Sequence, residues 1–392
     1  MINSSISKKQ VFIILIYIAI NSLFIYKYGL RTPFSPIAII VVYLFVIITS
    51  IYLFKKFSSF LSEITYKRLT WFALTLVIAC IGFLIYKIDP LSVRVDRWSA
   101  VSYFLDALFQ SKYPYAAHTH VSTTNFPSPF PIWYVINLPF YLLGDMGYGL
   151  IFFLFLYLYA IKMVFNSYKY VFMSILLLVL SPAYWWEVLV RSDSLSNGIL
   201  VFAILLLIYK KKFTIEKQFI LMIVLCGIIA CTRLSAVIPV VLFLFRPYIG
   251  LNLKMKILFP IGIIVFMLLC FAPFIFWDTN TWVFFERNPF MSQTSVGNVY
   301  ILIAMVALGI FVSFRWKNLI DFNYFTAIFI FIFISLSQLS LIFNNPESFS
   351  FTTDSNVDIS YFTLSLPYLI VYFTTFFEDN YQSKKTDYQN LV

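Results

Sequence analysis

The chain has 392 residues, of which 61% are hydrophobic and only 11% are charged, and its mean hydropathy is +0.88. Soluble domains carry about a quarter charged residues, so this composition excludes a soluble globular protein and predicts a polytopic membrane protein. The net charge of +11 does not indicate nucleic-acid binding, because most basic residues stand in short loops between apolar segments, where membrane orientation explains them.

Twelve apolar segments predict an all-α protein with about 12 transmembrane helices in a single domain over residues 1–378. Several are shorter than the roughly 20 residues that a bilayer requires, and the seventh and eighth could instead form one long broken helix. The polar residues 379–392 are expected to be a cytoplasmic tail. We expect helices at residues 11–28, 35–54, 69–88, 148–166, 169–186, 197–210, 218–232, 234–246, 256–277, 298–314, 322–343 and 361–378.

The distribution of basic residues predicts the orientation. With the N-terminus in the cytoplasm, most clusters of Lys and Arg fall on the inner side, among them Lys210–Lys212. This assignment requires that residues 131–144, PIWYVINLPFYLLG, do not cross the membrane; the segment is short and contains two prolines, which favours an interfacial or re-entrant position. The abundance of Phe, Ile, Tyr, Asn and Lys is typical of an AT-rich bacterial genome. We therefore expect a multi-pass protein of the bacterial inner (plasma) membrane with both termini cytoplasmic.

The first outer loop, residues 89–147, places charge directly at the membrane boundary. After Asp89, the stretch VRVDRWSA brings Asp96 between two arginines, and residues 97–111 have the spacing of an amphipathic surface helix. Asp96 is either the N-terminal cap of this helix, where its dipole favours a carboxylate, or a functional acid, and Asp89 competes for the second role. The apolar face of the helix consists of Trp98, Val101, Phe104, Leu105 and Leu108.

The same loop continues with KYPY and a segment rich in proline and aromatic residues. The aromatic side chains either belong to an interfacial belt or offer flat faces to sugar rings or lipid headgroups. His118 and His120 form an H-x-H pair that could bind a metal, although no third ligand is near in sequence. The four cysteines lie in apolar segments without a CxxC pair, so we expect neither a disulfide framework nor a zinc site.

Further charges stand between apolar segments in the other outer loops. A charge at bilayer depth costs about 2.5–3.5 kcal/mol or more, so Glu187, Arg191 and Asp193 in WWEVLVRSDSLSN need water, a partner or a ligand. One interpretation is a structural pair of Arg191 and Asp193, and the other is an anion-binding Arg191 held by Asp193. Arg233, in ACTRLSAV, either pairs with an outer-loop acid or binds a phosphate or carboxylate. The third outer loop adds Glu286, Arg287 and Gln293.

Together these motifs resemble the GT-C superfamily of integral-membrane glycosyltransferases, especially bacterial mannosyltransferase-like members that use polyprenyl-phosphate sugars. The matching features are Asp96 in VDRWSA, then KYPY, PSPFPIWY and LPFYLLGD, then LSPAYWWEVLVRSDSLSNGIL and IIACTRLSAVIPVVL, within about residues 69–250. The helical pair at 11–54 stands ahead of the family's usual first helix.

The resemblance implies sugar transfer on the outer face of the membrane with inversion at the anomeric carbon. Asp96 would be the general base for the acceptor hydroxyl. Arginines would stabilise the leaving lipid phosphate, so no cofactor is strictly required, although a divalent metal stays open. The implied partners are a lipid-linked sugar donor, a glycan or glycolipid acceptor and membrane lipids. The donor-phosphate residues would be Arg191, Arg233, Arg287 and His118, and the supporting residues Asp193, Asp89, Glu187 and Tyr113.

A polysaccharide polymerase or a lipid-linked-sugar flippase is the main alternative. A flippase is expected to carry polar residues along the middles of several helices, whereas here they gather at one membrane level, which favours an enzyme. A pure transporter is disfavoured because the sequence has no visible internal repeat.

Overall fold

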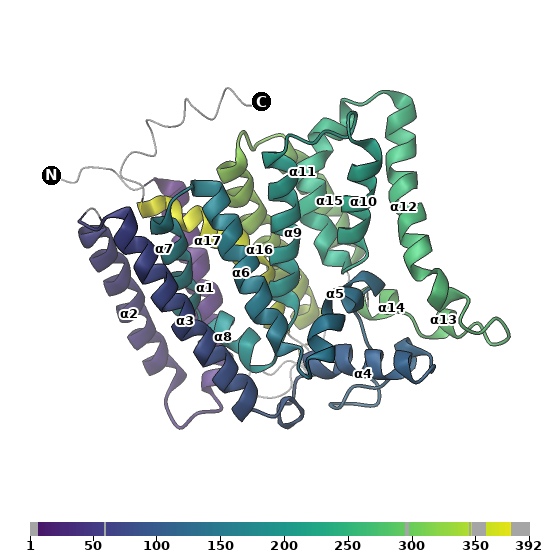
Figure 1. The fold of residues 1–392 in the computed structure, drawn as a ribbon, viewed down its shortest axis with the longest axis horizontal. Coiled ribbons are helices and arrows are strands. Elements are labelled where there is room, and N and C mark those ends of the chain that lie inside the picture. The colour runs from purple at the N-terminus through teal and green to yellow at the C-terminus, as the bar shows by residue number, and fades with distance from the viewer. Residues whose placement is uncertain (1–6, 59, 295–297, 345, 347–357, 378–392) are drawn as a thin grey trace. The chain divides into compact units, whose positions relative to one another are not determined.

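A computed structural model describes residues 7–58, 60–294, 298–344, 346 and 358–377 (Figure 1). The structure is 78% helical, and the residues it describes include no β-strand, which confirms the expected all-α class. The contacts divide the chain into two compact units. Unit 1 contains Met1–Cys80, Phe155–Glu187 and Arg315–Val392, and unit 2 contains Ile81–Leu154 and Val188–Phe314. The predicted tail, 379–392, lies outside the described residues, and the single domain stays a prediction.

Unit 1 is built around a short, completely buried helix near the C-terminal end of the described chain. This helix, α17, consists of nine residues that are all buried, and α1, α7 and α16 pack against it (Figure 1). Helix α1 begins at a capping box in which the side chains of Ser7 and Gln10 satisfy each other's backbone N–H groups. The helices of unit 1 are α1 (Lys8–Gly29), α2 (Pro36–Phe57), α7 (Tyr168–Val179), α8 (Pro182–Leu189), α16 (Leu319–Asn344), η5 (Ile359–Ser365), α17 (Leu366–Thr374) and η6 (Thr375–Phe377), and it shares α3 (Glu63–Lys87), α6 (Gly147–Phe165) and the last residues of α8 with unit 2.

The helix expected over residues 169–186 is broken in the structure. It forms α7 and α8, which are bent by 70°, because Pro182 cannot continue the hydrogen-bond ladder of α7. Asn21 of α1 satisfies polar groups at the break: its Oδ1 accepts hydrogen bonds from the Ser181 hydroxyl at 2.6 Å and from the Ala183 N–H at 3.2 Å. The buried amide therefore stabilises a bend that the apolar pattern of the sequence does not reveal.

Unit 2 contains a pair of closely packed helices, α10 and α12 (Figure 1). A Cβ atom on Gly227 would lie 2.5 Å from Phe266, and one on Gly262 would lie 2.5 Å from Ile223, so each glycine lets the partner helix approach. Both pairs differ by 39 positions (266 − 227 and 262 − 223), which means that the helices run parallel. The elements of unit 2 are η1 (Pro90–Ser92), α4 (Arg97–Phe109), η2 (Pro114–Ala116), α5 (Pro131–Leu142), α9 (Ser194–Lys210), α10 (Phe219–Ala230), η3 (Leu234–Ala236), α11 (Val237–Ile249), α12 (Leu253–Ile275), α13 (Val283–Glu286), α14 (Pro289–Thr294) and α15 (Val299–Ser313).

Helix length and composition support a multi-pass membrane protein. Among the described residues, seven helices are long and apolar enough to cross a membrane, or up to nine if each of two bent helix pairs is one span. Helices α9, α10 and η3–α11 are apolar but shorter, so length alone does not establish the expected twelve spans. Helix α5, in the segment that the orientation argument keeps out of the bilayer, has 12 residues and is not a candidate span.

Candidate functional site

A buried ion pair in unit 2 joins the start of α9 to the turn before η3. Arg233 donates from Nη2 to both carboxylate oxygens of Asp193, at 2.6 and 2.5 Å, and from Nε to Oδ2 at 3.1 Å. Only 5% of the arginine side chain and 8% of the aspartate side chain are exposed. Asp193 occupies the N-cap position of α9 without capping it through its side chain. Arg233 therefore pairs with Asp193, an acid of the second loop that the sequence analysis placed outside, and a role of Arg233 in phosphate binding stays a prediction.

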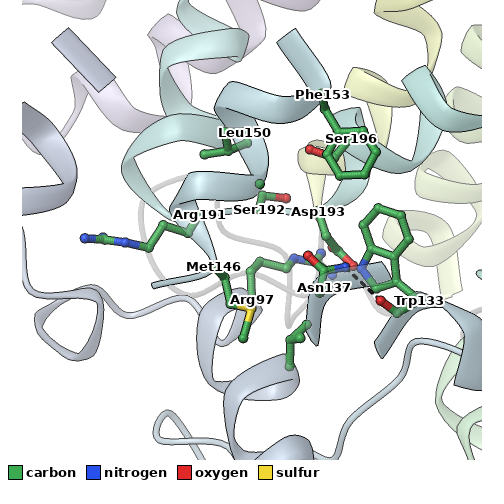
Figure 2. A pocket seen from close by; sticks show the side chains of 12 residues that line it. Arg97, Trp133, Asn137, Met146, Leu150, Phe153, Arg191, Ser192, Asp193 and Ser196 are labelled. Carbon is green, nitrogen blue, oxygen red and sulfur yellow. Dashed lines mark hydrogen bonds between the residues drawn. The ribbon is translucent and has the colours of Figure 1, made fainter. Parts of the chain in front are cut away.

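Arg191 does not pair with Asp193, and this corrects both sequence interpretations of their relationship. Its Nε donates to Asp145 at 2.9 and 3.0 Å, and its Nη2 donates to the carbonyl oxygens of Ile85 and Ile88 at 2.8 and 2.7 Å. These carbonyls lie at the C-terminal end of α3, where the helix dipole attracts a cation. The backbone of Arg191 is left-handed, with φ of 50°, and its side chain points away from Asp193 (Figure 2). Arg191 thus connects the segment between α8 and α9 to Asp145 and to the C-terminal end of α3.

A pocket lies beside the Asp193–Arg233 pair. Arg97 from α4, Trp133 and Asn137 from α5, and Asp193 and Ser196 contribute to its wall (Figure 2). Its open volume of about 10 Å³ is room for about one water molecule. Sequence reasoning did not assign Arg97 to the site, although the residue directly follows Asp96. The same reasoning missed Trp133 and Asn137, because aromatic and amide side chains in an apolar segment have no distinguishing spacing.

Several buried polar atoms of α5 and α9, two helices that contribute residues to the pocket wall, have no hydrogen-bond partner within the part of the chain that the structure describes. They are Trp133 Nε1 and Tyr134 OH on α5, and Ser194 Oγ and both amide atoms of Asn197 on α9. The ring of Tyr134 stacks on Phe104 of α4, with centroids 3.4 Å apart. Burial raises the pKa of Tyr134 well above its usual value, so the phenol is protonated and can donate a hydrogen bond.

The two acids that compete for the catalytic role have different environments. Asp89 is exposed, and its carboxylate accepts a hydrogen bond from the Leu91 N–H at 2.9 Å, which caps η1. Asp96 occupies the N-cap position of α4 but makes no side-chain cap bond. Its carboxylate instead accepts a hydrogen bond from Asn125 Nδ2 at 3.2 Å. Capping by the side chain is therefore the function of Asp89 in this loop and not of Asp96.

Helix α4 forms at Arg97–Phe109, close to the predicted 97–111. Its apolar face packs on protein, since Val101, Phe104 and Leu105 are buried and Phe104 also meets the rings of Tyr115 and Phe274. The hydroxyl of Tyr141 on α5 donates to Asp106 of α4 at 2.5 Å, and this hydrogen bond is the main cause that raises the pKa of Tyr141 to about 12. Unit 2 thereby fixes α4, and with it the backbone of Asp96.

The imidazole ring of His120 is held between two parts of the first outer loop. Its Nδ1 lies 2.6 Å from the Ser99 hydroxyl and its Nε2 lies 2.9 Å from the Val93 carbonyl oxygen, so both ring nitrogens already have partners. Within the described ranges, no group of three or more His, Cys, Asp or Glu side chains is placed to hold a metal ion.

His118, Arg287 and Tyr113 meet in a separate group around Phe126. The Arg287 guanidinium lies 4.1 Å from the centre of the Phe126 ring, and the His118 ring lies 4.9 Å from it. Tyr113 donates a hydrogen bond to the Arg287 carbonyl oxygen at 2.8 Å. The described contacts link none of these three residues to the Asp193–Arg233 pair, with which the sequence had grouped them.

Glu187, which the sequence placed among the supporting residues, belongs to unit 1. Its side chain is fully buried and accepts a hydrogen bond from the Thr363 hydroxyl of η5 at 3.0 Å. Glu187 therefore contacts the C-terminal apolar segment of the chain.

Comparison of the chain with protein-family models, with curated proteins and with solved structures finds no match in any of the three. The functional assignment consequently depends on the sequence motifs and on the geometry of unit 2.

Proposed function

We propose that the protein is a membrane glycosyltransferase of the GT-C type that moves a sugar from a polyprenyl-phosphate donor to an acceptor hydroxyl on the outer face of the membrane. The observation that carries the proposal is the placement of Asp96. Its carboxylate is not used as a helix cap, and the next residue, Arg97, lines a pocket beside the buried Asp193–Arg233 pair.

Sugar transfer by a single displacement needs one base for the acceptor hydroxyl and one group that stabilises the leaving phosphate. Asp96 takes the proton of the acceptor hydroxyl while the oxygen forms a bond to C1 of the sugar. The bond between C1 and the phosphate oxygen breaks at the same time, and the polyprenyl phosphate leaves with the electron pair. A single displacement of this kind inverts the configuration at C1. Arg233 and Arg97 are the arginines that we assign to the growing negative charge on the phosphate.

Arg233 can bind an anion without leaving Asp193. Its three described hydrogen bonds use Nε and Nη2, and within the described chain Nη1 meets no acceptor. Asp193 would hold the guanidinium in place while Nη1 contacts the phosphate. Arg191, by contrast, pairs with Asp145 and with carbonyl oxygens at the end of α3, so the phosphate site that we propose does not include it.

We further propose twelve membrane crossings, made by the seven long apolar helices, the two bent pairs and the three shorter apolar helices. With α5 outside the bilayer, this count keeps both termini in the cytoplasm and most basic loops on the inner side of the bacterial plasma membrane. The proposed site then faces outward. A lipid-linked donor is favoured over a nucleotide sugar because the latter is made in the cytoplasm, and because the sequence has no glycine-rich phosphate loop.

A transfer assay tests the proposal. The purified protein in lipid nanodiscs is given a mixture of glycan acceptors and either decaprenyl-phosphate sugars or nucleotide sugars, and the glycosylated product and released decaprenyl phosphate are measured by mass spectrometry. We expect product and decaprenyl phosphate in equal amounts with the lipid donors. Transfer from nucleotide sugars with no polyprenyl phosphate present, or no transfer from any lipid donor, would contradict the proposal.

A further inference from the structure

The side-chain amide of Asn197 is the most unusual buried group in unit 2. The residue has no exposed surface, and neither its Nδ2 nor its Oδ1 has a hydrogen-bond partner in the described chain. A buried amide without partners costs free energy, because the folded state loses the hydrogen bonds that water supplies to the unfolded chain. A protein that keeps such a group on a helix at this cost retains it for another reason.

The unpartnered atoms belong to one region. Asn197 lies four residues after Asp193, which places the two side chains on the same side of α9 at its first turn. Tyr134 of α5 interacts electrostatically with both Arg233 and Asp193. Its neighbour Trp133, which has no exposed surface and an unpartnered indole N–H, lines the pocket together with Asp193 (Figure 2). The unused polar groups therefore lie on α9, which begins at Asp193, and on α5, whose Tyr134 interacts with the ion pair.

The chemistry of these groups indicates what they bind. An indole N–H only donates, whereas a phenol hydroxyl and a carboxamide both donate and accept hydrogen bonds. An ionised phosphate group only accepts hydrogen bonds, and the guanidinium of Arg233 is a donor of the kind that binds phosphate. A sugar ring, with several hydroxyls that each donate and accept, matches the mixed set better. One face of the Trp133 indole stacks on Phe153, and the other is suited to pack on the sugar ring.

We propose that Asn197, Tyr134 and Trp133 form the sugar-selective part of the site and recognise the hydroxyls of a neutral, lipid-linked sugar. This inference rests on the proposed function and adds to it the residues that distinguish the sugar from the rest of the donor. The pocket has room for about one water molecule, so the sugar enters only when side chains at its wall move. The long, unbranched side chains of Arg97 and Met146 line this pocket and can change rotamer for this purpose.

Thermal unfolding in nanodiscs tests the inference independently of transfer. The probes are decaprenyl phosphate without a sugar and decaprenyl phosphate carrying mannose, glucose or arabinose. We expect at least one glycosylated lipid to bind at least about tenfold more tightly than the sugar-free lipid, the factor that one neutral hydrogen bond supplies. In Tyr134→Phe and Asn197→Leu this preference should fall about tenfold, while sugar-free decaprenyl phosphate binds as before.

The stability of the lipid-free variants separates recognition from a structural role. Asn197→Leu and Tyr134→Phe remove groups without protein partners, so their melting temperatures should equal or exceed that of the wild type. The matched control is Asn21→Leu in unit 1, which removes a buried amide with described hydrogen bonds and should lower the melting temperature without changing the sugar preference.

The inference is wrong if no glycosylated lipid is preferred, if both variants keep the preference, or if both melt below the wild type, which would show that the polar groups serve the fold. The proposed function fails separately, when no lipid donor supports transfer, whatever the binding data show.

Discussion

Arg233 and Asp193 form a bidentate ion pair with almost no exposure, although 40 positions separate them in the chain. A buried pair of this kind contributes little net stability, since both charges lose their hydration. Its consequence is geometric: the guanidinium is held at the start of α9, beside the pocket that Arg97 and Trp133 line. The pair therefore orders the site more than it stabilises the fold.

The first prediction concerns the loss of one partner. Asp193→Ala leaves the Arg233 charge buried and uncompensated, and Arg233→Ala does the same to Asp193, so each variant should lower the free energy of unfolding by about 3–5 kcal/mol. The double variant Asp193→Leu/Arg233→Met should lose less than the sum of the two. Fluorescence-detected denaturation in detergent measures these values.

Lys9 and Asp321 of unit 1 provide the control for that experiment. Their Nζ and Oδ1 atoms lie 3.1 Å apart, and 45% of the lysine side chain is exposed. Because exposed pairs contribute about 1 kcal/mol or less, Lys9→Met should change the stability little. Equal losses in the Lys9 and Asp193 variants would contradict the view that the Asp193–Arg233 pair is shielded from solvent.

The second prediction separates the two acids of the first outer loop. Asp96→Asn keeps the shape of the side chain but removes the base, so transfer from the lipid donor should fall by about 10²–10⁴, the loss typical of general-base catalysis, with the melting temperature nearly unchanged. Asp89→Asn should stay close to wild-type turnover, because asparagine caps a helix about as well as aspartate. The opposite pattern would move the base to Asp89.

The third prediction concerns orientation. In a variant without the four native cysteines, a cysteine at Ser122 should react with a membrane-impermeant maleimide in intact cells, and a cysteine at Phe213 should react only after the cells are opened. Ser122 belongs to the loop between α4 and α5, and Phe213 follows the basic Lys210–Lys212 cluster. Labelling of position 213 in intact cells would reverse the proposed topology.

Apolar patterning predicted the positions of most helices, because it is a local property of the chain. The bend between α7 and α8 also has a sequence signal in Pro182, but the compensating amide of Asn21 comes from a distant helix. The partners of Arg191 and Arg233 could not be predicted for the same reason. Asp193 stands nearest to Arg191 in sequence, yet it pairs with Arg233, while Arg191 pairs with Asp145.

Buried polar groups that lack partners are still harder to foresee. Asn197 on α9 and Asn21 on α1 both stand within apolar helical sequences, and the sequence does not distinguish them. The amide of Asn197 has no described hydrogen bond, whereas the amide of Asn21 has several. The difference appears only when the neighbouring helices are in place. Sequence alone therefore located the loops that carry the candidate site, and the tertiary structure decided which of their residues face one another.

The last prediction tests the packing of α10 on α12 through two native cysteines. The 39-position offset that pairs Gly227 with Phe266 also relates Cys231 to Cys270, and the two thiols interact electrostatically. No sequence pattern predicts this proximity, since 38 residues separate the two cysteines and neither belongs to a CxxC motif.

All four cysteines are free thiols in the structure, so a maleimide-polyethylene glycol should add four labels to the denatured, reduced protein. After treatment of the membranes with copper phenanthroline, we expect only two labels, because the oxidant joins Cys231 and Cys270 in a disulfide, and dithiothreitol should restore all four. In Cys270→Ser the oxidant should leave the three remaining thiols free. Four labels on the oxidised wild type, or a protected pair that includes Cys80, would show that α10 and α12 do not pack in the parallel register described above.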